Sequence, residues 1–358
     1  MNGKNIQVTY CPEAKRKPKP QDSELGFGKY FTDHMFIQEY INNEWQTPQI
    51  VPYQNISLDP SALVLHYGQE IFEGMKAYPN SNGSVYLFRP HKNAQRFNFS
   101  ARRMCMPEVD EELFIEAIST LVKIDKDWIP RSPGTSLYIR PTMIATEAAL
   151  GVHPSNKYLF YVILSPVGPY FKEGFKPVKI YVASQHVRAT PGGTGEAKTG
   201  GNYAATLYET KIAQSLGYSQ VLWLDALERR FVEEVGAMNI MFVIDGEIYT
   251  PPLDGTILHG NTREAVLELA KDLGYKTHEE PIDINILVEE IKQDRCTEAF
   301  GTGTAASITP IGELYYRETK YVINGFEVGP ITKHLYEELI GIQTGTKPDR
   351  FNWMYKIF

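Results

Sequence analysis

A glycine-rich loop at residues 191–203 carries a single lysine, Lys198. Five glycines lie between positions 192 and 201, so the backbone can bend sharply and a ligand can come close to it. An amine in such a loop suits two chemistries. It can pair with a phosphate group, or it can form a Schiff base with an aldehyde cofactor. The choice between them largely decides what the protein does.

The first chemistry, that of a nucleotide phosphate loop, fits the sequence poorly. The pattern GxxxxGK[ST] requires glycine before the lysine, and this chain has Ala197. That motif also lies directly between a strand and a helix. Here residues 185–191 separate the preceding predicted strand from the loop, and Gly200 and Gly201 delay the next helix. A phosphate-loop NTPase is therefore a distant alternative, and Lys198 taken alone is most simply a solvated loop lysine.

Two adjacent acids, Glu233 and Glu234, lie in an apolar strand-turn-strand segment at 231–242. Successive strand side chains point to opposite faces, so one acid can face a pocket while the other meets solvent. A pyridinium nitrogen needs a carboxylate partner to stay protonated, and the protonated ring then acts as an electron sink. Taken alone, however, such a pair is more often two solvent-facing acids.

Two further segments are typical of anion sites, although both can be ordinary caps and turns. Residues 259–264 lead into a predicted helix whose first amides have no intrahelical partner. Residues 300–306 read as a small-residue loop that contains Thr302 and Thr304. Arg96, on a predicted helix face, is by itself an ordinary exposed cation. Only the combination of lysine, acid, anion sites and arginine favours a functional site.

Composition excludes several classes of protein. Of 358 residues, 42% are hydrophobic and 22% charged, and the net charge of −7 argues against nucleic-acid or anionic-membrane binding. We see no apolar run near the roughly 20 residues that cross a bilayer. Cys11, Cys105 and Cys296 are widely spaced, so we expect free thiols in a reducing compartment, with no metal site or disulfide framework. The predicted location is cytoplasmic.

The pattern of elements indicates an α+β protein and not a run of βαβ crossovers. A segment rich in proline and glycine, 165–177, is the best candidate for a linker between a domain at 1–164 and another at 178–358. Asp110 is a plausible N-cap for one of the helices. The predicted helices are 91–104, 110–124, 203–216, 262–273 and 283–292, and the predicted strands include 35–40, 63–65, 84–88, 136–141, 158–165, 178–183, 219–224, 297–300 and a ribbon at 238–250 around Asp245-Gly246.

The chain resembles the branched-chain-amino-acid aminotransferases, a family of fold-type-IV pyridoxal-phosphate enzymes. The motifs run in family order across residues 26–310 and are jointly very specific. The matching segments are GFGKYFTDHM (26–35), HYGQEIFEGMKA (66–77), LFRP (87–90) with Asn93 and Arg96, GTSLYIRP (134–141), the Lys198 loop, EVGAMN (234–239), LDGTILHG (253–260) and FGTGTA (300–305).

The resemblance implies a pyridoxal 5′-phosphate site and assigns its residues. Lys198 would form the Schiff base and shuttle the proton from the substrate Cα, and Tyr203 would hydrogen-bond the phenolic oxygen. Glu234 would hold the pyridinium nitrogen. The phosphate would be bound by Arg96, by the amides of Asn261 and Thr262, and by Thr304, since a helix N-terminus and a guanidinium both favour a dianion.

The resemblance also implies the substrate groups. Phe27, Phe72, Tyr138 and Tyr170 would wall an apolar side-chain pocket, with Val152 contributed by a partner subunit. Tyr67, Arg140 and the backbone at Ala237 and Ala305 would bind or orient the carboxylate region. Two positions depart from the family: Ala237 stands where many members have threonine, and the Cys-x-x-Cys of mammalian members would fall at Ala306 and Thr309.

The implied protein is a homodimeric transaminase that exchanges amino groups between Leu, Ile or Val and 2-oxoglutarate. The implied architecture has a smaller N-terminal α/β domain and a larger C-terminal domain with a barrel-like sheet, and the cofactor binds between them. Another fold-type-IV enzyme, such as a D-amino-acid aminotransferase or an aminodeoxychorismate lyase, is the nearest alternative. Segments 66–77 and 134–141 favour the branched-chain enzyme.

Overall fold

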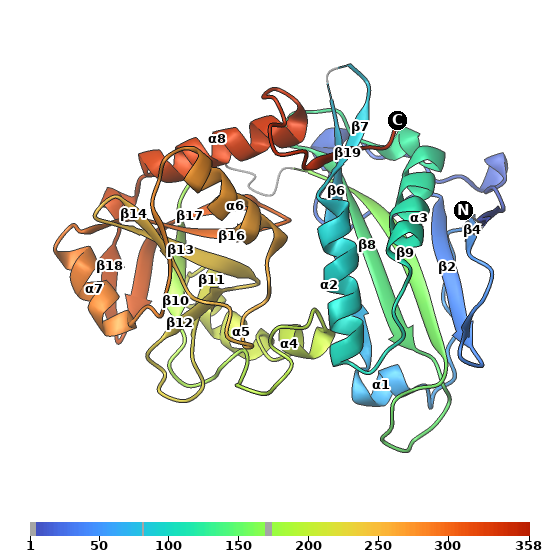
Figure 1. Cartoon of the computed structure of the whole chain (residues 1–358), viewed down its shortest axis with the longest axis horizontal. Helices are drawn as coiled ribbons and strands as arrows, with labels where there is room; N and C mark the ends of the chain where they lie inside the picture. The colour runs from blue at the N-terminus through green and yellow to red at the C-terminus, as the bar shows by residue number, and fades with distance from the viewer. Residues whose placement is uncertain (1–4, 81, 169–173) are drawn as a thin grey trace. The chain divides into compact units, whose positions relative to one another are not determined.

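The computed structural model describes residues 5–80, 82–168 and 174–358 (Figure 1). Tyr170 and residues 169–173 of the predicted linker lie outside the described residues. The contacts divide the chain into two compact units. The first comprises Met1–Tyr170, Ala197–Gly200 and Ile342–Phe358, and the second comprises Phe171–Glu196 and Gly201–Gly341. The predicted domain limits, 1–164 and 178–358, stay predictions, whereas these units are discontinuous in the sequence.

The first unit is built on a ten-stranded sheet in the order β1-β4-β2-β9-β8-β6-β7-β19, with β3 paired to β2 and β5 paired to β8. Every pair in it is antiparallel except β1–β4. The strands are β1 (Gln7–Val8), β2 (His34–Ile41), β3 (Glu44–Trp45), β4 (Gln49–Pro52), β5 (Glu70–Phe72), β6 (Met75–Pro79), β7 (Val85–Phe88), β8 (Ser136–Ala145), β9 (Tyr158–Val167) and β19 (Met354–Lys356).

Helices α2 (Pro90–Arg103) and α3 (Glu111–Ile124) lie along this sheet (Figure 1). Three fully buried rings, Phe97 of α2, Phe114 of α3 and Phe160 of β9, meet with centroids 5.3–5.9 Å apart. As predicted, Asp110 caps α3, and its carboxylate accepts a hydrogen bond from the amide of Leu113 at 2.8 Å. A short helix, α1 (Leu63–Tyr67), and 3₁₀ turns at Glu13–Lys15, Asp22–Glu24 and Lys126–Trp128 complete the helical segments of this unit.

The second unit contains a barrel. Its nine-stranded sheet has the order β12-β11-β10-β17-β16-β13-β14-β15, with β18 paired to β17. An additional pairing between β12 and β13 closes six of these strands into a ring. The strands are β10 (Val178–Val182), β11 (Gln220–Leu224), β12 (Val232–Val235), β13 (Met238–Ile244), β14 (Glu247–Thr250), β15 (Thr277–Glu279), β16 (Cys296–Gly303), β17 (Ser307–Tyr316) and β18 (Thr319–Val322).

A buried apolar cluster fills this second unit and includes Leu222, Phe242 and Leu314. The remaining helices are α4 (Gly200–Ala204), α5 (Leu207–Ser215), α6 (Asn261–Asp272), α7 (Ile284–Lys292) and α8 (Pro330–Thr344), with a 3₁₀ turn at Asn324–Phe326. None of the described helices has the length and hydropathy that crossing a bilayer requires. The predicted α+β class with a barrel-like sheet is confirmed.

Three local predictions are wrong. Residues 63–65 belong to helix α1 and not to a strand. The helix predicted at 203–216 is broken into α4 and α5, where the Thr206 hydroxyl donates to the carbonyl of Tyr203 at 2.7 Å and competes with helical pairing. The loop predicted at 300–306 is strand β16 as far as Gly303, followed by a tight turn into β17.

Candidate active site

Lys198 belongs to the first unit, where strand β5 and helix α2 hold its backbone. The amide of Phe72 donates to the Lys198 carbonyl at 3.0 Å. The Lys198 amide donates to Ser100 Oγ at 2.9 Å, and Thr199 Oγ1 donates to the carbonyl of Glu70 at 2.7 Å. The backbone at Lys198 is therefore held by hydrogen bonds to β5 and to α2, although residues 197–199 belong to no helix or strand.

Beside Lys198, the structure brings together four of the predicted substrate residues. Lys198 Nζ lies 4.7 Å from the ring centroid of Phe72, and Arg140 Cζ lies 4.7 Å from the same centroid. Arg140 Nη2 donates to Tyr138 Oη at 3.0 Å, and the Tyr138 ring meets Phe27 with centroids 4.8 Å apart. Arg140 Nε is buried and has no hydrogen-bond partner among the described residues. An amine, an aromatic wall and a guanidinium with an unused donor suit an apolar ligand that carries a carboxylate.

Arg96 is buried on α2, so its interpretation as an exposed cation is wrong. Its Nε and Nη2 donate to the two carboxylate oxygens of Glu73 at 2.7 and 2.9 Å, and Asn93 Nδ2 also donates to Glu73 at 2.7 Å. Burial opposes ionisation of Glu73, but Arg96 outweighs it and lowers the pKa of this carboxyl below its usual range, with Lys198 acting in the same direction. The phosphate contact assigned to Arg96 stays a prediction.

Two other predicted residues of this unit have different surroundings. Tyr67, at the end of α1, donates its hydroxyl to the carbonyl of Leu150. Val152 is 83% exposed, and Leu150 is 65% exposed. Leu150 and Val152 are therefore apolar side chains that the chain leaves exposed.

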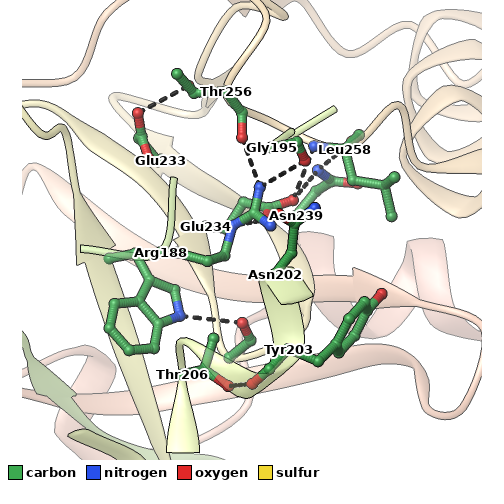
Figure 2. A network of polar contacts seen from close by, with 12 residues as sticks. Arg188, Gly195, Asn202, Tyr203, Thr206, Glu233, Glu234, Asn239, Thr256 and Leu258 are labelled. Carbon is green, nitrogen blue, oxygen red and sulfur yellow. Dashed lines mark hydrogen bonds and ion pairs between the residues drawn. The ribbon is translucent and has the colours of Figure 1, made fainter. Parts of the chain in front are cut away.

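In the second unit, Glu234 lies at the centre of a buried polar network (Figure 2). Arg188 Nε lies 2.5 Å from Glu234 Oε2. Asn239 Nδ2 and the amide of Leu258 donate to Glu234 Oε1 at 3.1 and 3.3 Å. Arg188 Nη2 also donates to the carbonyls of Gly195 and Thr256 at 3.0 and 2.5 Å. A carboxylate with a guanidinium and two N–H donors is held in its charged form.

Glu233 departs from the expectation that one acid of the pair meets solvent. Both are buried, Glu233 at 5% and Glu234 at 3% exposure. The two point to opposite faces of β12, as alternation requires, but Glu233 meets Thr256, whose hydroxyl donates to its Oε1 at 2.7 Å (Figure 2). The sequence around Glu233 did not predict this contact, because Thr256 lies 23 residues further along the chain.

Asn239 connects Glu234 to the other predicted residues of this unit. It pairs with Thr302 across β13 and β16, and a Cβ added to Gly260, the N-cap of α6, would collide with its side chain. The hydroxyl of Thr302 is buried without a hydrogen-bond partner among the described residues. Asn261 and Thr262 begin α6, Thr304 and Ala305 form the β16–β17 turn, Ala237 lies in the β12–β13 turn, and Tyr203 lies half-buried in α4.

Sequence reasoning missed three residues that organise these groups: Arg188, Asn239 and Glu73. Asn239 and Glu73 lie inside segments that match the family, EVGAMN and HYGQEIFEGMKA, so their places in those motifs were a usable signal. Arg188 had no such signal, because its pairing with Glu234 spans 46 residues of sequence.

The donor set fits pyridoxal phosphate better than a metal. Among the residues that the structure describes, no group of three or more His, Cys, Asp or Glu side chains could hold a metal ion. The first unit offers an amine and an unused guanidinium donor. The second offers a charged carboxylate, an orphaned hydroxyl at Thr302, and a helix N-terminus that begins at a glycine. The amine suits the aldehyde of this cofactor, and the charged carboxylate suits its protonated ring nitrogen. The helix N-terminus suits its phosphate.

A family model described as amino-transferase class IV matches residues 70–314 of this chain. The chain belongs to the class IV aminotransferases. Its aligned relatives place it among the branched-chain-amino-acid aminotransferases. It is 52% identical over 343 residues to branched-chain-amino-acid aminotransferase 2 of Bacillus subtilis (strain 168), covering 96% of this chain and 94% of that protein. It is 50% identical over 339 residues to a probable branched-chain-amino-acid aminotransferase of Staphylococcus aureus (strain N315), covering 94% of each.

Solved aminotransferases share the fold. The branched-chain amino acid aminotransferase of Escherichia coli superposes with a TM-score of 0.76 at 26% identity, covering 90% of this chain and 99% of that one. The T.th. branched-chain amino acid aminotransferase, solved with pyridoxamine 5′-phosphate, gives 0.75 at 28% identity, covering 90% and 98%. Class IV aminotransferases use pyridoxal phosphate, and this aminotransferase has the same cofactor.

Proposed function

We propose that this aminotransferase reversibly moves the amino group of L-leucine, L-isoleucine or L-valine to 2-oxoglutarate, giving branched-chain 2-oxo acids and L-glutamate. The observation that carries the proposal is the arrangement around Lys198. Its amine and the Arg140 guanidinium both lie 4.7 Å from the centroid of the Phe72 ring. An amino acid with an apolar side chain needs an apolar wall, a cation for its carboxylate and a base near Cα, and this cluster supplies all three.

Lys198 is the base in this proposal. Pyridoxal phosphate, when bound, supplies an aldehyde that takes up the amino group and a protonated ring that withdraws electrons from Cα. Lys198 Nζ would hold the cofactor, and it would accept the proton from the substrate Cα and later return it. The hydrogen bonds that Lys198 makes with Ser100 and Phe72, and the one from Thr199 to Glu70, limit the movement of its backbone.

Glu234 has the role of keeping the ring nitrogen protonated. Arg188, Asn239 and the amide of Leu258 favour its charged form, which a cationic ring nitrogen requires as a partner. We assign the phenolic oxygen to Tyr203. We assign the phosphate to Arg96, to the first amides of α6 at Asn261 and Thr262, and to Thr304.

The substrate side chain is assigned to Phe27, Phe72 and Tyr138, and its carboxylate region to Arg140, Tyr67 and the backbone at Ala237 and Ala305. Such an apolar pocket separates Leu, Ile and Val by about 1–3 kcal/mol for each methylene. Ala237 lacks the hydroxyl that many family members have there, so the Arg140 guanidinium carries more of the carboxylate binding.

We also propose a homodimer in the cytoplasm. Leu65, Leu150 and Val152 are each more than half exposed in the first unit, and exposed large apolar side chains are candidates for an interface. Val152 would then reach the pocket of the partner subunit. Cys11, Cys105 and Cys296 form no disulfide with one another, which agrees with a reducing compartment.

The first prediction tests this function through Lys198. Lys198→Ala should abolish turnover of L-leucine with 2-oxoglutarate, by at least roughly a thousandfold, because it removes both the covalent attachment and the base. The assay measures glutamate formation, and the absorbance of the bound cofactor is recorded before and after L-leucine is added.

Lys211→Ala, an exposed lysine on α5, is the matched control and should keep full activity. D-leucine and L-leucine are compared in the same assay, because preference for the D-enantiomer would identify the alternative fold-type-IV activity. Retained turnover in a folded Lys198→Ala protein would remove Lys198 from the mechanism.

A further inference from the structure

A cavity lies in the second unit beside β12, and Glu233, which points to the opposite face of that strand from Glu234, lines it. It measures about 220 Å³, and its walls include Pro251, Pro252, Phe231, Glu233, Asp254 and Thr256. Typical sites for drug-sized ligands enclose roughly 300–1,000 Å³, so the occupant of this cavity is a small molecule. None of the roles assigned above uses it.

Glu233, a wall residue of this cavity, has an unsatisfied carboxylate oxygen. The residue is 95% buried (5% exposed), and its Oε2 has no hydrogen-bond partner among the described residues. Its other oxygen accepts from the Thr256 hydroxyl at 2.7 Å. A buried carboxylate oxygen without a partner costs free energy, so it marks a place where a donor or a cation would be stabilised.

The Thr256 hydroxyl also contacts Asp254 Oδ1, at 2.9 Å. A hydroxyl has one proton and can donate to one carboxylate at a time. If both acids are ionised, one of the two contacts therefore joins two oxygens with no proton between them. Either a proton on Glu233 or a positive charge beside the two acids relieves this conflict.

Among the described residues that line the cavity, no lysine or arginine supplies that charge. Arg188, whose charge acts on Glu233, is bonded to Glu234 and to two carbonyls on the other face of β12. Asp225, also on the wall, already accepts four backbone amides, from residues 227, 228, 230 and 231. Glu228, also on the wall, is paired with Arg230 at 3.0 Å. Among the described wall carboxylates, Glu233 and the exposed Asp254 are therefore the two that are not already paired with a cation or a set of backbone amides.

We propose that this cavity binds a small organic cation, with its charged nitrogen between Glu233 and Asp254 and its apolar body against Pro251, Pro252 and Phe231. The site is separate from that of the proposed transamination. An amine, amidinium or guanidinium donates N–H groups to two carboxylates at once. A free amino acid is disfavoured because its own carboxylate would enter an acidic cavity, and proline and phenylalanine walls suit carbon and not a hydrated metal ion.

The protonation of Glu233 sets the pH dependence. Burial raises the pKa of this carboxyl to about 7, while the Thr256 hydrogen bond and the Arg188 charge oppose that rise and the charges of Asp254 and Glu234 add to it. A cation binds the ionised form, whose fraction grows as pH rises through 7. Affinity should therefore increase about tenfold between pH 6 and pH 8.

Benzamidine tests the proposal, because it is a flat amidinium on an aromatic ring and is a poor partner for an aldehyde. Calorimetric titration of the holoenzyme at pH 8 should show one site for each chain. Benzamide, which has the same shape and no charge, should bind at least about tenfold more weakly. Glu233→Gln and Asp254→Asn should each weaken benzamidine about tenfold or more, and Glu233→Gln should also abolish the pH dependence.

Glu337→Gln, an exposed acid on α8, is the matched control and should bind like the wild type. If Glu233→Gln does not fold, the exposed Asp254 still tests the site. Equal binding of benzamide, unchanged affinity in both acid variants, or no binding at millimolar benzamidine would each overturn the proposal. The readout is binding and not turnover, so its failure leaves the proposed transamination untouched.

Discussion

Arg188 and Glu234 form the most consequential residue pair in the second unit. Their side chains are 6% and 4% exposed, so each charge depends on the other for compensation. Deleting one partner of a buried pair leaves an unpaired buried charge, which typically costs about 3–5 kcal/mol. Arg188 additionally binds the carbonyls of Gly195 and Thr256, so it also fixes the chain around the carboxylate.

We therefore predict that Arg188→Met lowers the free energy of unfolding by about 3–5 kcal/mol, measured by urea denaturation. The double variant Arg188→Met/Glu234→Gln should regain a large part of this loss, because it no longer buries a lone charge. A single variant as stable as the wild type would show that the pair contributes little.

The residues that carry the family motifs were predictable from the sequence, and their neighbours were not. Lys198 and Glu234 stand in local patterns that can be read directly. Taken alone, Arg96 was interpreted as an exposed cation and one acid of the Glu233–Glu234 pair as solvent-facing, whereas all three are buried. The cover of Glu233 and Arg96 comes from Thr256 and Glu73, each more than 20 residues away in the chain. The local sequence pattern does not predict contacts between residues that lie so far apart in the chain.

At the scale of elements, strand β5 acts as a clamp on the Lys198 segment. The amide of Phe72 donates to the Lys198 carbonyl, and the Thr199 hydroxyl donates to the Glu70 carbonyl. The Lys198 amide donates to Ser100 Oγ of α2. The amine of Lys198, which we propose as the base, is thus placed by rigid elements although it lies on a loop, which is a common way to combine precision with access to a ligand.

Thr199→Val tests this clamp. It preserves side-chain shape but removes the hydrogen bond to the Glu70 carbonyl, a contact typically worth about 0.5–1.5 kcal/mol. We expect kcat for L-leucine to fall roughly two- to tenfold while KM stays nearly constant, because substrate-binding groups are unchanged. Thr199→Ser, which keeps the hydroxyl, should restore kcat. Equal kcat for the valine variant and the wild type would show that the contact does not position Lys198.

Elements with strong end signals were predicted well. Helix α3 begins after Asp110, as expected, and the hairpin β13–β14 turns at Asp245 and Gly246, both with positive φ. Elements without such signals were missed. Helix α1 is five residues long, too short to show a helical period, and α8 and β19 follow the last family motif.

At the scale of the whole molecule, the chain enters the first unit for only four residues, Ala197–Gly200, within a stretch otherwise assigned to the second. Lys198 is therefore packed with residues of the N-terminal sheet although it lies far from them in sequence. An isolated fragment ending near residue 168 would therefore lack Lys198, whose carbonyl accepts the amide of Phe72.

The proposed homodimer gives the last prediction. Analytical ultracentrifugation of the wild type should give a molecular mass twice that of one chain, which is 40.6 kDa. Val152→Glu should raise the dimer dissociation constant about tenfold or more, because a charge would be buried in an apolar interface. Val322→Glu, at a 50% exposed position on β18, is the control and should leave the dimer intact. Unchanged sedimentation of the Val152 variant would place the interface elsewhere.

The pairing of β12 with β13 has a further consequence for how this protein can vary. Because β12 closes the ring, a one-residue slip of its register would exchange the two faces of the strand and present Glu233 or Val235 where Glu234 now stands. The turn at Gly236 and Ala237 therefore has no freedom in length. Sequence drift can alter the side chains of this turn, but an insertion or deletion there would exchange the charged partners on both faces of the strand at once.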